Sequence, residues 1–101
     1  MLKQQITIQE DRILISGELT FSTVTALWEF SQKLFPQQGQ WNCDFSQVTS
    51  CDSAGLALLL EWIKLAKQKG KKLRFLQLPK QLQAIAAPAG LNALLDEVSA
   101  S

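Results

Sequence analysis

Isoleucine stands at every second position in two short segments near the start of the chain, residues 5–9 and 12–16. A period of two residues is typical of a β-strand with one buried face. The polar pair Glu10-Asp11 lies between the segments and is expected to be a tight connection. The pattern therefore predicts a β-hairpin at the start of a sheet.

Two later segments also predict strands. Residues 41–45 alternate, with Trp41, Cys43 and Phe45 on one face, and residues 72–78 are rich in Leu and Phe. The mostly polar residues 46–50 are expected to be a connection that leaves the third strand.

The first predicted helix covers about residues 22–35, where apolar residues recur at helical spacing. Ser22 or Thr23 is expected to be its N-cap, because a short hydroxyl side chain can accept a hydrogen bond from a free N–H of the first turn. Pro36 is expected to stop the helix.

Three further helices are predicted. The longest covers about residues 53–69 and is followed by Gly70, a residue type typical of the C′ position. A shorter helix is expected from Pro79, at its N1 position, to about Ala87. One or two final helical turns are expected within residues 91–98.

The order of these elements is β-β-α-β-α-β-α, followed by a small terminal helix. Strand–helix–strand units join parallel strands through right-handed crossovers, whereas a hairpin is antiparallel. The sequence therefore predicts an α/β fold: a mixed four-stranded sheet, an opening hairpin followed by parallel strands, packed with about four helices. The 101 residues, without an evident linker, are expected to form a single domain, 1–101.

The helix predicted at 53–69 is expected to bury one face and to offer another to a partner. At about 100° per residue, Trp62 lies at the edge of the buried face, whose members are Leu56, Leu59, Ile63 and Ala66. Ala54, Leu58 and Leu65 flank Glu61 on the outward side. Apolar residues gathered outside the core indicate a candidate contact surface.

A short motif, Asp52-Ser53-Ala54-Gly55, precedes this helix. Asp52 and Ser53 can both accept hydrogen bonds from the first turn, and the positive end of the helix dipole favours a carboxylate at Asp52. Gly55 allows the first turn to pack closely against a neighbouring element. The motif is thus a good helix cap that stands beside the candidate contact surface.

The composition argues against several classes of function. The net charge of +1 gives no electrostatic case for binding nucleic acid or an anionic membrane. The chain has no histidine, no GxxxxGK[ST] and no GxGxxG, so it cannot supply a histidine-based catalytic device or a phosphate-binding loop of those types. Cys43 and Cys51 lack metal-ligand or CxxC spacing and are expected to be reduced packing residues. We therefore expect no enzyme activity, no metal and no cofactor.

The sequence also carries expectations about location. Residues 1–10 lack the apolar segment of a signal peptide, and the run 54–60 is far shorter than the roughly 20 apolar residues of a membrane span. The chain is therefore expected to be cytoplasmic. The lysines around Gly70 are expected to be a solvated helix end that complements the dipole, in preference to a binding patch.

Three segments together resemble the STAS-domain family: SGEL at 16–19, WNCDFSQV at 41–48 and CDSAGLALLLEWIKLAKQKG at 51–70. The hallmark of that family is an aspartate, a Ser or Thr, a further small residue and a glycine that open the helix after the third strand. With ALWEF at 26–30, the segments are most similar to the branch formed by small STAS subunits of the Mla phospholipid-transport ABC system of Gram-negative bacteria.

This resemblance implies a non-enzymatic regulatory subunit that binds the ATPase of such a system, which also contains a membrane permease and maintains outer-membrane lipid asymmetry. It implies a location peripheral to the inner membrane through that partner. Ser53 stands where that branch has a functionally important threonine. The residues expected to contact the partner are Asp52, Ser53, Ala54, Gly55, Leu58, Glu61 and Leu65.

Other functions remain open at this stage. Anti-anti-sigma factors belong to the same family and bind a serine-kinase anti-sigma factor, but Ala54 occupies the position of their phosphorylated hydroxyl; phosphorylation of Ser53 remains possible. An enzyme using Asp52 and Ser53 would lack a base beside the hydroxyl. A lipid carrier is disfavoured because a chain of this size needs its apolar residues for one core.

Overall fold

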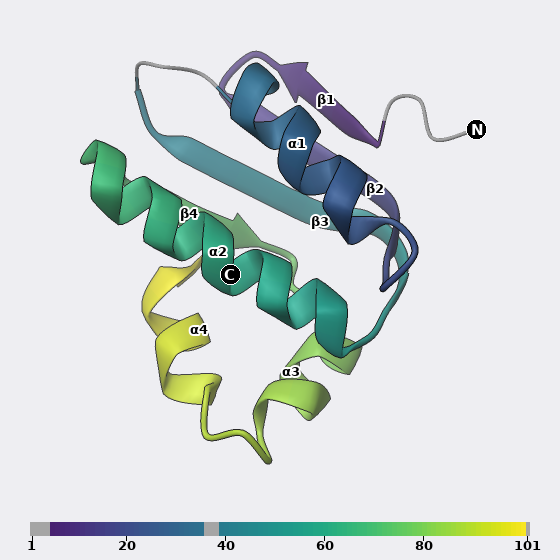
Figure 1. The fold of residues 1–101 in the computed structure, drawn as a ribbon. Helices are drawn as coiled ribbons and strands as arrows, with labels where there is room; N and C mark the ends of the chain where they lie inside the picture. Colours follow the sequence, from purple (N-terminus) through teal and green to yellow (C-terminus); the bar gives the residue numbers. More distant parts are fainter. Residues whose placement is uncertain (1–4, 36–38, 101) are drawn as a thin grey trace.

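The computed structural model describes residues 5–35 and 39–100, which form one mixed sheet packed with helices (Figure 1). The strands are β1 (Ile6–Gln9), β2 (Arg12–Leu19), β3 (Trp41–Cys51), β4 (Leu73–Leu76) and β5 (Ser99–Ala100). The helices are α1 (Val24–Leu34), α2 (Ser53–Lys69), α3 (Lys80–Ala86) and α4 (Asn92–Val98).

The strands lie side by side in sequence order. β1 and β2 are antiparallel, and each later pair, β2–β3, β3–β4 and β4–β5, is parallel. The predicted α/β fold, an opening hairpin followed by parallel strands, is therefore confirmed. The two-residue β5 adds an edge strand that is too short to produce an alternating pattern in the sequence.

The predicted helix ends are largely confirmed. Thr23 is the N-cap of α1, although its hydroxyl donates to the Glu18 carbonyl (2.7 Å) instead of capping the helix. Gly70 ends α2 in the left-handed conformation, with φ 66°. Pro79 directly precedes α3 as its N-cap, one position earlier than predicted. Pro36, the predicted stop of α1, lies outside the described residues.

The prediction of a connection at 46–50 is wrong, because β3 continues to Cys51. The second half of β3 pairs with the second half of β2, bringing Leu19 opposite Cys51, and two register shifts interrupt the pairing. Only Val48 within residues 46–50 is apolar. This half of the strand is held by backbone pairing with a distant segment, which leaves no local hydrophobic pattern.

Gly17 and Gln5 lie at the register shift in β2, between Gly17 and Glu18. Gly17 has φ 80°, a left-handed conformation that favours glycine. The Gln5 side-chain amide donates to the carbonyls on either side of Gly17, those of Ser16 (2.8 Å) and Glu18 (3.1 Å). A Cβ at position 17 would lie 2.8 Å from this amide nitrogen.

The core lies between the sheet and the helices. Trp41, Phe45 and Phe75 project from the strands and are almost completely buried. Phe45 and Phe75 meet edge to face, with ring centroids 5.2 Å apart, a favourable aromatic geometry. Cys43 lies between Trp41 and Phe45 on the same face of β3 and is fully buried, which confirms it as a packing residue.

Helix α2 buries a wider face than helical periodicity predicted. Trp62 is fully buried and does not lie at an edge, and the prediction that Leu58 faces outward is wrong, because only 4% of its surface is exposed. Trp62 donates a hydrogen bond to Ser31 of α1, which places α1 on this side of α2. Leu58 lies one turn before Trp62 on the same side, so we attribute its burial to α1.

The contact between α1 and α2 includes a buried polar chain. The Trp62 indole N–H donates to the Ser31 hydroxyl (2.9 Å), and this hydroxyl donates to the Trp28 carbonyl (2.7 Å). Ser31 and Trp62 are both completely buried. Each polar hydrogen of the chain has an acceptor, as a buried polar group requires.

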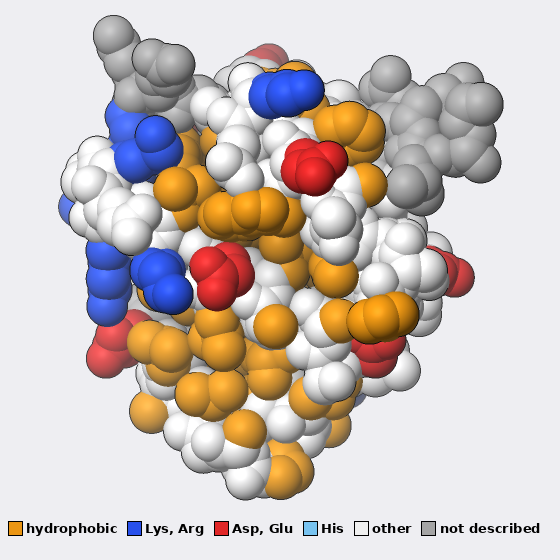
Figure 2. Space-filling model, viewed as in Figure 1, with side chains coloured by type: hydrophobic (Ala, Val, Ile, Leu, Met, Phe, Trp, Pro, Cys, Tyr) orange, Lys and Arg blue, Asp and Glu red, His pale blue; other side chains and the backbone are white. Residues whose placement is uncertain are grey.

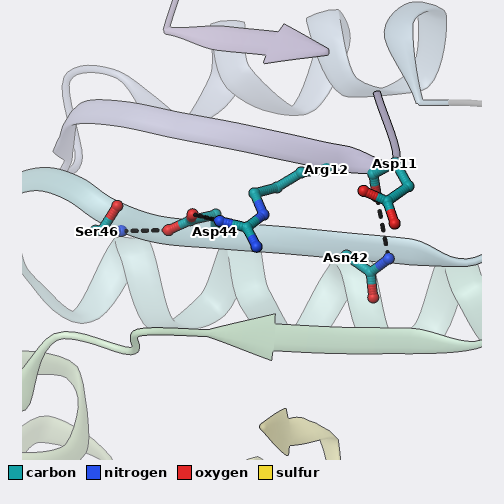
Figure 3. A network of polar contacts seen from close by, with 5 residues as sticks. All are labelled: Asp11, Arg12, Asn42, Asp44 and Ser46. Carbon is teal, nitrogen blue, oxygen red and sulfur yellow. Dashed lines mark hydrogen bonds and ion pairs between the residues drawn. The ribbon is translucent and has the colours of Figure 1, made fainter. Parts of the chain in front are cut away.

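The opposite face of the sheet carries polar side chains, seen from close by in Figure 3. Asn42, Asp44 and Ser46 alternate along β3 with the core residues and so point away from the core. The Asp44 carboxylate accepts from the Arg12 guanidinium (3.0 Å) and the Ser46 N–H (2.8 Å). Burial raises the pKa of Asp44, but the Ser46 hydrogen bonds and Arg12 outweigh it and lower that pKa below its ordinary value.

Replacing Ser31 by Ala should destabilise the fold. The Trp62 N–H would lose its acceptor in a buried site, and an unsatisfied buried donor costs about 1–3 kcal/mol. Urea denaturation should show this decrease in the free energy of unfolding. Gln32→Ala, on the exposed side of the same helix turn, is the matched control. Equal stability of Ser31→Ala and wild type would contradict a stabilising role for the bond.

Candidate functional site

The predicted cap residue Asp52 lies where β2, β3 and α2 meet. Its N–H donates to the Leu19 carbonyl at the end of β2 (3.1 Å). One oxygen of its carboxylate accepts from the N–H groups of Ala54 (2.9 Å) and Gly55 (3.3 Å) in the first turn of α2. The other oxygen accepts from the Phe21 N–H (3.1 Å). A single side chain thus caps the helix, as predicted, and also fixes the loop between β2 and α1.

These hydrogen bonds define the ionisation state of the site. The Phe21 N–H lowers the pKa of Asp52 most, and the N–H groups of Ala54 and Gly55 lower it further. The carboxylate is therefore ionised at neutral pH. An ionised carboxylate whose oxygens already accept hydrogen bonds is a poor proton donor, so the arrangement observed here serves the structure of the chain.

Gly55 packs against the chain's own strand. A Cβ built at position 55 would overlap the Leu19 carbonyl oxygen and would lie 2.9 Å from the Leu19 Cβ. The prediction that Gly55 permits a close approach is therefore confirmed, and the close neighbour is β2. Because Gly55 is buried there, it has no free surface to offer to a partner.

The other predicted contact residues differ in exposure. Ser53 and Glu61 are exposed on the outer side of α2, and Glu61 pairs at 3.8 Å with Lys64, itself exposed. Ala54 and Leu65 are half-buried. With Leu58 and Gly55 buried, the accessible part of the predicted surface is the exposed Ser53 and Glu61, together with the half-buried Asp52, Ala54 and Leu65.

Phe21 is the residue that sequence reasoning missed. Its side chain is 85% exposed, the most of the four exposed large hydrophobic residues identified in the described chain. Its backbone N–H donates to Asp52, so the backbone of Phe21 is held beside the start of α2. The sequence feature that could have revealed it is an isolated aromatic residue between the polar residues Thr20 and Ser22. An exposed, anchored aromatic is a typical interface residue.

The surface next to this site, over α3 and α4, is largely uncharged. Figure 2 shows hydrophobic side chains gathered over α3 and α4, beside the N-terminal half of α2. Between Lys80 and Asp96 the sequence carries no charged residue. Depletion of charge is typical of the centre of a protein–protein interface.

Metal and thiol chemistry find little support in the described residues. They contain no group of three or more His, Cys, Asp or Glu side chains that could hold a metal ion. Burial raises the pKa of Cys43, and burial followed by the charge of Asp52 raises that of Cys51. Both thiols are therefore protonated at neutral pH.

No helix among residues 5–35 and 39–100 is long and apolar enough to cross a bilayer.

The free energy of unfolding should depend on pH through the ionisation of Asp52. Since its folded-state pKa lies below the unfolded value of about 3.9, the carboxylate stabilises the fold above that value. This contribution is lost as the pH falls through the folded-state pKa. Asp52→Asn should be less stable than wild type at pH 7, and the difference should shrink toward pH 2–3 in urea titrations. Asp96→Asn is the control for loss of one charge, and a difference that stays constant with pH would contradict the assignment.

Sequence and structure comparisons agree with this geometry. Residues 2–96 match the family described as "Mlab, STAS domain". The intermembrane phospholipid transport system binding proteins MlaB of Escherichia coli K12 and Shigella flexneri are each 40% identical to the chain over 60 residues. These regions cover 59% of this chain and 60% of each relative, so the matched segment is less than two thirds of either relative's length.

Solved structures support the fold. A sulfate transporter family protein from Wolinella succinogenes has a TM-score of 0.68 at 17% identity, covering 88% of this chain and 74% of that one. A protein described as Mglu has a TM-score of 0.59 at 17% identity, covering 75% of this chain and 19% of that one. The family match spans nearly the whole chain and includes the Asp52–Gly55 motif. The chain therefore belongs to the MlaB-type STAS-domain family.

Proposed function

We propose that the chain is a non-enzymatic accessory subunit of a phospholipid-transport ABC system and that it binds the ATPase subunit of that system. The observation that carries this proposal is the exposed Phe21, whose backbone N–H is bonded to Asp52, the residue before the exposed Ser53. The 40% identity to proteins named as MlaB supports the choice of system. The subunit would lie in the cytoplasm and reach the inner membrane only through its partner.

The proposed contact surface consists of Phe21, Ser53, Ala54 and Glu61. Phe21 would fill an apolar pocket on the ATPase, and Ser53 would make a short polar contact next to it. Ala54 is small and half-buried, so it would allow close approach. Glu61 would lie at the rim, where a charge affects association rate more than affinity. Leu65, at the far half of α2, would contribute at most at the margin.

The chain would act on the ATPase by stabilising one of its conformational or assembly states. The chain lacks a phosphate-binding loop of the GxxxxGK[ST] type, so it would not hydrolyse ATP. It would favour one conformation of the ATPase, or its assembled dimer, by binding that state more tightly than the alternatives.

Binding should depend on Phe21 and Ser53. Phe21→Ala should weaken the affinity for the cognate ATPase on the order of 30-fold or more, as expected for a central aromatic, and Ser53→Arg should abolish capture. Phe30→Ala removes another exposed phenylalanine, on α1, and should bind as wild type does. Calorimetry and co-purification measure these effects. Wild-type capture by both folded variants, Phe21→Ala and Ser53→Arg, would remove the proposed surface.

ATP hydrolysis by the transporter should change with the subunit. Addition of the wild-type chain should raise the ATPase rate of the partner, whereas Ser53→Arg should leave that rate at its basal level. Ser53→Glu tests the predicted phosphorylation site, because a negative charge in the contact surface should also release the partner. Phosphorylation of Ser53 by an anti-sigma-type kinase, with no effect of the chain on the ATPase, would favour the anti-anti-sigma alternative.

A further inference from the structure

β1 forms an open edge of the sheet. It is the first strand in the sheet order, and among the described residues β2 is its only neighbouring strand. The Ser16 N–H donates to the Gln5 carbonyl (2.8 Å), so Gln5 and Ser16 are a hydrogen-bonded pair of the antiparallel ladder. Hydrogen-bonded and non-hydrogen-bonded pairs alternate along such a ladder. The backbone N–H and C=O groups of Ile6 and Ile8 therefore point away from β2, toward the open edge.

An apolar strip, formed by Ile8, Phe30 and Leu34, accompanies this edge on the helix side of the sheet. The side chains of Ile6 and Ile8 share the face of β1 that is turned toward the helices, since Ile6 belongs to the core. α1 packs against β1 (Figure 1), and Phe30 and Leu34 lie one turn apart on one flank of α1. Ile8, Phe30 and Leu34 are 39%, 40% and 45% exposed, and they are three of the four exposed large hydrophobic residues identified in the described chain.

Phe30 is turned away from α2, and Leu34 follows it one turn later. Ser31 and Phe35, by contrast, both contact Trp62 of α2. At about 100° per residue, Phe30 lies roughly 100° from Ser31 and roughly 140° from Phe35 around the helix axis. Since α1 also packs against β1, the flank that carries Phe30 borders the open edge of the sheet. The open strand and the apolar strip thus form one continuous surface.

The charges at this edge are complementary to those of a second copy of the same chain. β1 carries no charge, no proline and no bulge, the devices that commonly prevent pairing between edges, and only its short length protects it. In a two-fold symmetric contact the same patch of each copy meets the other, so an uncharged strand pairs with itself without like-charge repulsion. Glu29 and Lys33 are exposed on α1 beside Phe30 and Leu34. When two α1 helices lie antiparallel, Glu29 of each copy approaches Lys33 of the other.

We infer that two copies of this chain associate through the β1 edge, with β1 of one copy adding antiparallel to β1 of the other. Ile6 of each copy exchanges its outward backbone hydrogen bonds with Ile8 of the other. The two-fold axis is perpendicular to the joined sheet, so the helices of both copies stay on the same face and the two apolar strips, each of Ile8, Phe30 and Leu34, meet. The inference does not rest on the proposed function, because the proposed ATPase contact lies at the start of α2, outside this surface.

Sedimentation equilibrium of the whole chain tests the association. The wild type should show a monomer–dimer equilibrium between about 10 μM and about 1 mM, the range of a weak interaction. Ile8→Pro removes an outward N–H at an edge position that tolerates proline, and Phe30→Asp brings like charges together in the strip. Each should weaken dimerisation on the order of tenfold or more.

Phe21→Ala, which removes an exposed phenylalanine outside the strip, is the matched control and should dimerise as wild type does. Circular dichroism checks that each variant is folded. A wild-type chain that stays monomeric at about 1 mM would overturn the inference. Wild-type dimerisation of both folded variants, Ile8→Pro and Phe30→Asp, would overturn it as well.

Charge reversal on α1 tests the antiparallel arrangement of the two copies. Glu29→Lys alone, or Lys33→Glu alone, puts like charges together in the dimer and should weaken it about threefold to tenfold at low salt. The double variant Glu29→Lys with Lys33→Glu restores opposite charges and should recover the wild-type affinity. A double variant that dimerises no better than the single variants would contradict the arrangement.

Amide hydrogen exchange locates the interface. The Ile6 and Ile8 amides should exchange more slowly as the concentration of the chain rises, whereas the Thr7 amide, which faces β2, should change little. Protection of Ile6 and Ile8 that appears only when the ATPase is added to a monomeric chain would assign the edge to that partner and overturn the inference.

Discussion

The contact between the Leu19 carbonyl and the first turn of α2 is the constraint on which the rest of the structure depends. The carbonyl accepts the Asp52 N–H, and Gly55 lies so close that any side chain there would overlap it. Two strand ends and a helix start are thereby fixed at one point. The long helix then extends across the sheet from this point, and its buried face, centred on Leu59 and Trp62, becomes the main wall of the core.

The same constraint shapes the proposed contact surface. The Asp52 carboxylate holds the start of α2 with one oxygen and the Phe21 N–H with the other. The backbone of Phe21 is therefore fixed near the start of α2 before any partner arrives. A surface whose backbone is already ordered loses less conformational entropy on binding.

The two ends of α2 differ in chemistry. At its start, capped by Asp52, the neighbouring helix α3 presents mostly uncharged residues, a composition typical of the centre of a protein–protein interface. At its end, Lys67 and Lys69 lie in the last turn, where their charges complement the helix dipole.

Local residue patterns determined the element types, the Gly70 stop, the Asp52 cap and the family, because each depends on residues a few positions apart. Tertiary structure alone decided the rest. Residues 46–50 form a strand through pairing with β2. The burial of Leu58 was not predicted, because helical periodicity gives the direction of a side chain but not how wide a face of the helix its neighbours cover. The placement of Phe21 follows from a hydrogen bond to a residue 31 positions away. Such contacts between distant segments form only when the chain folds, so no local pattern encodes them.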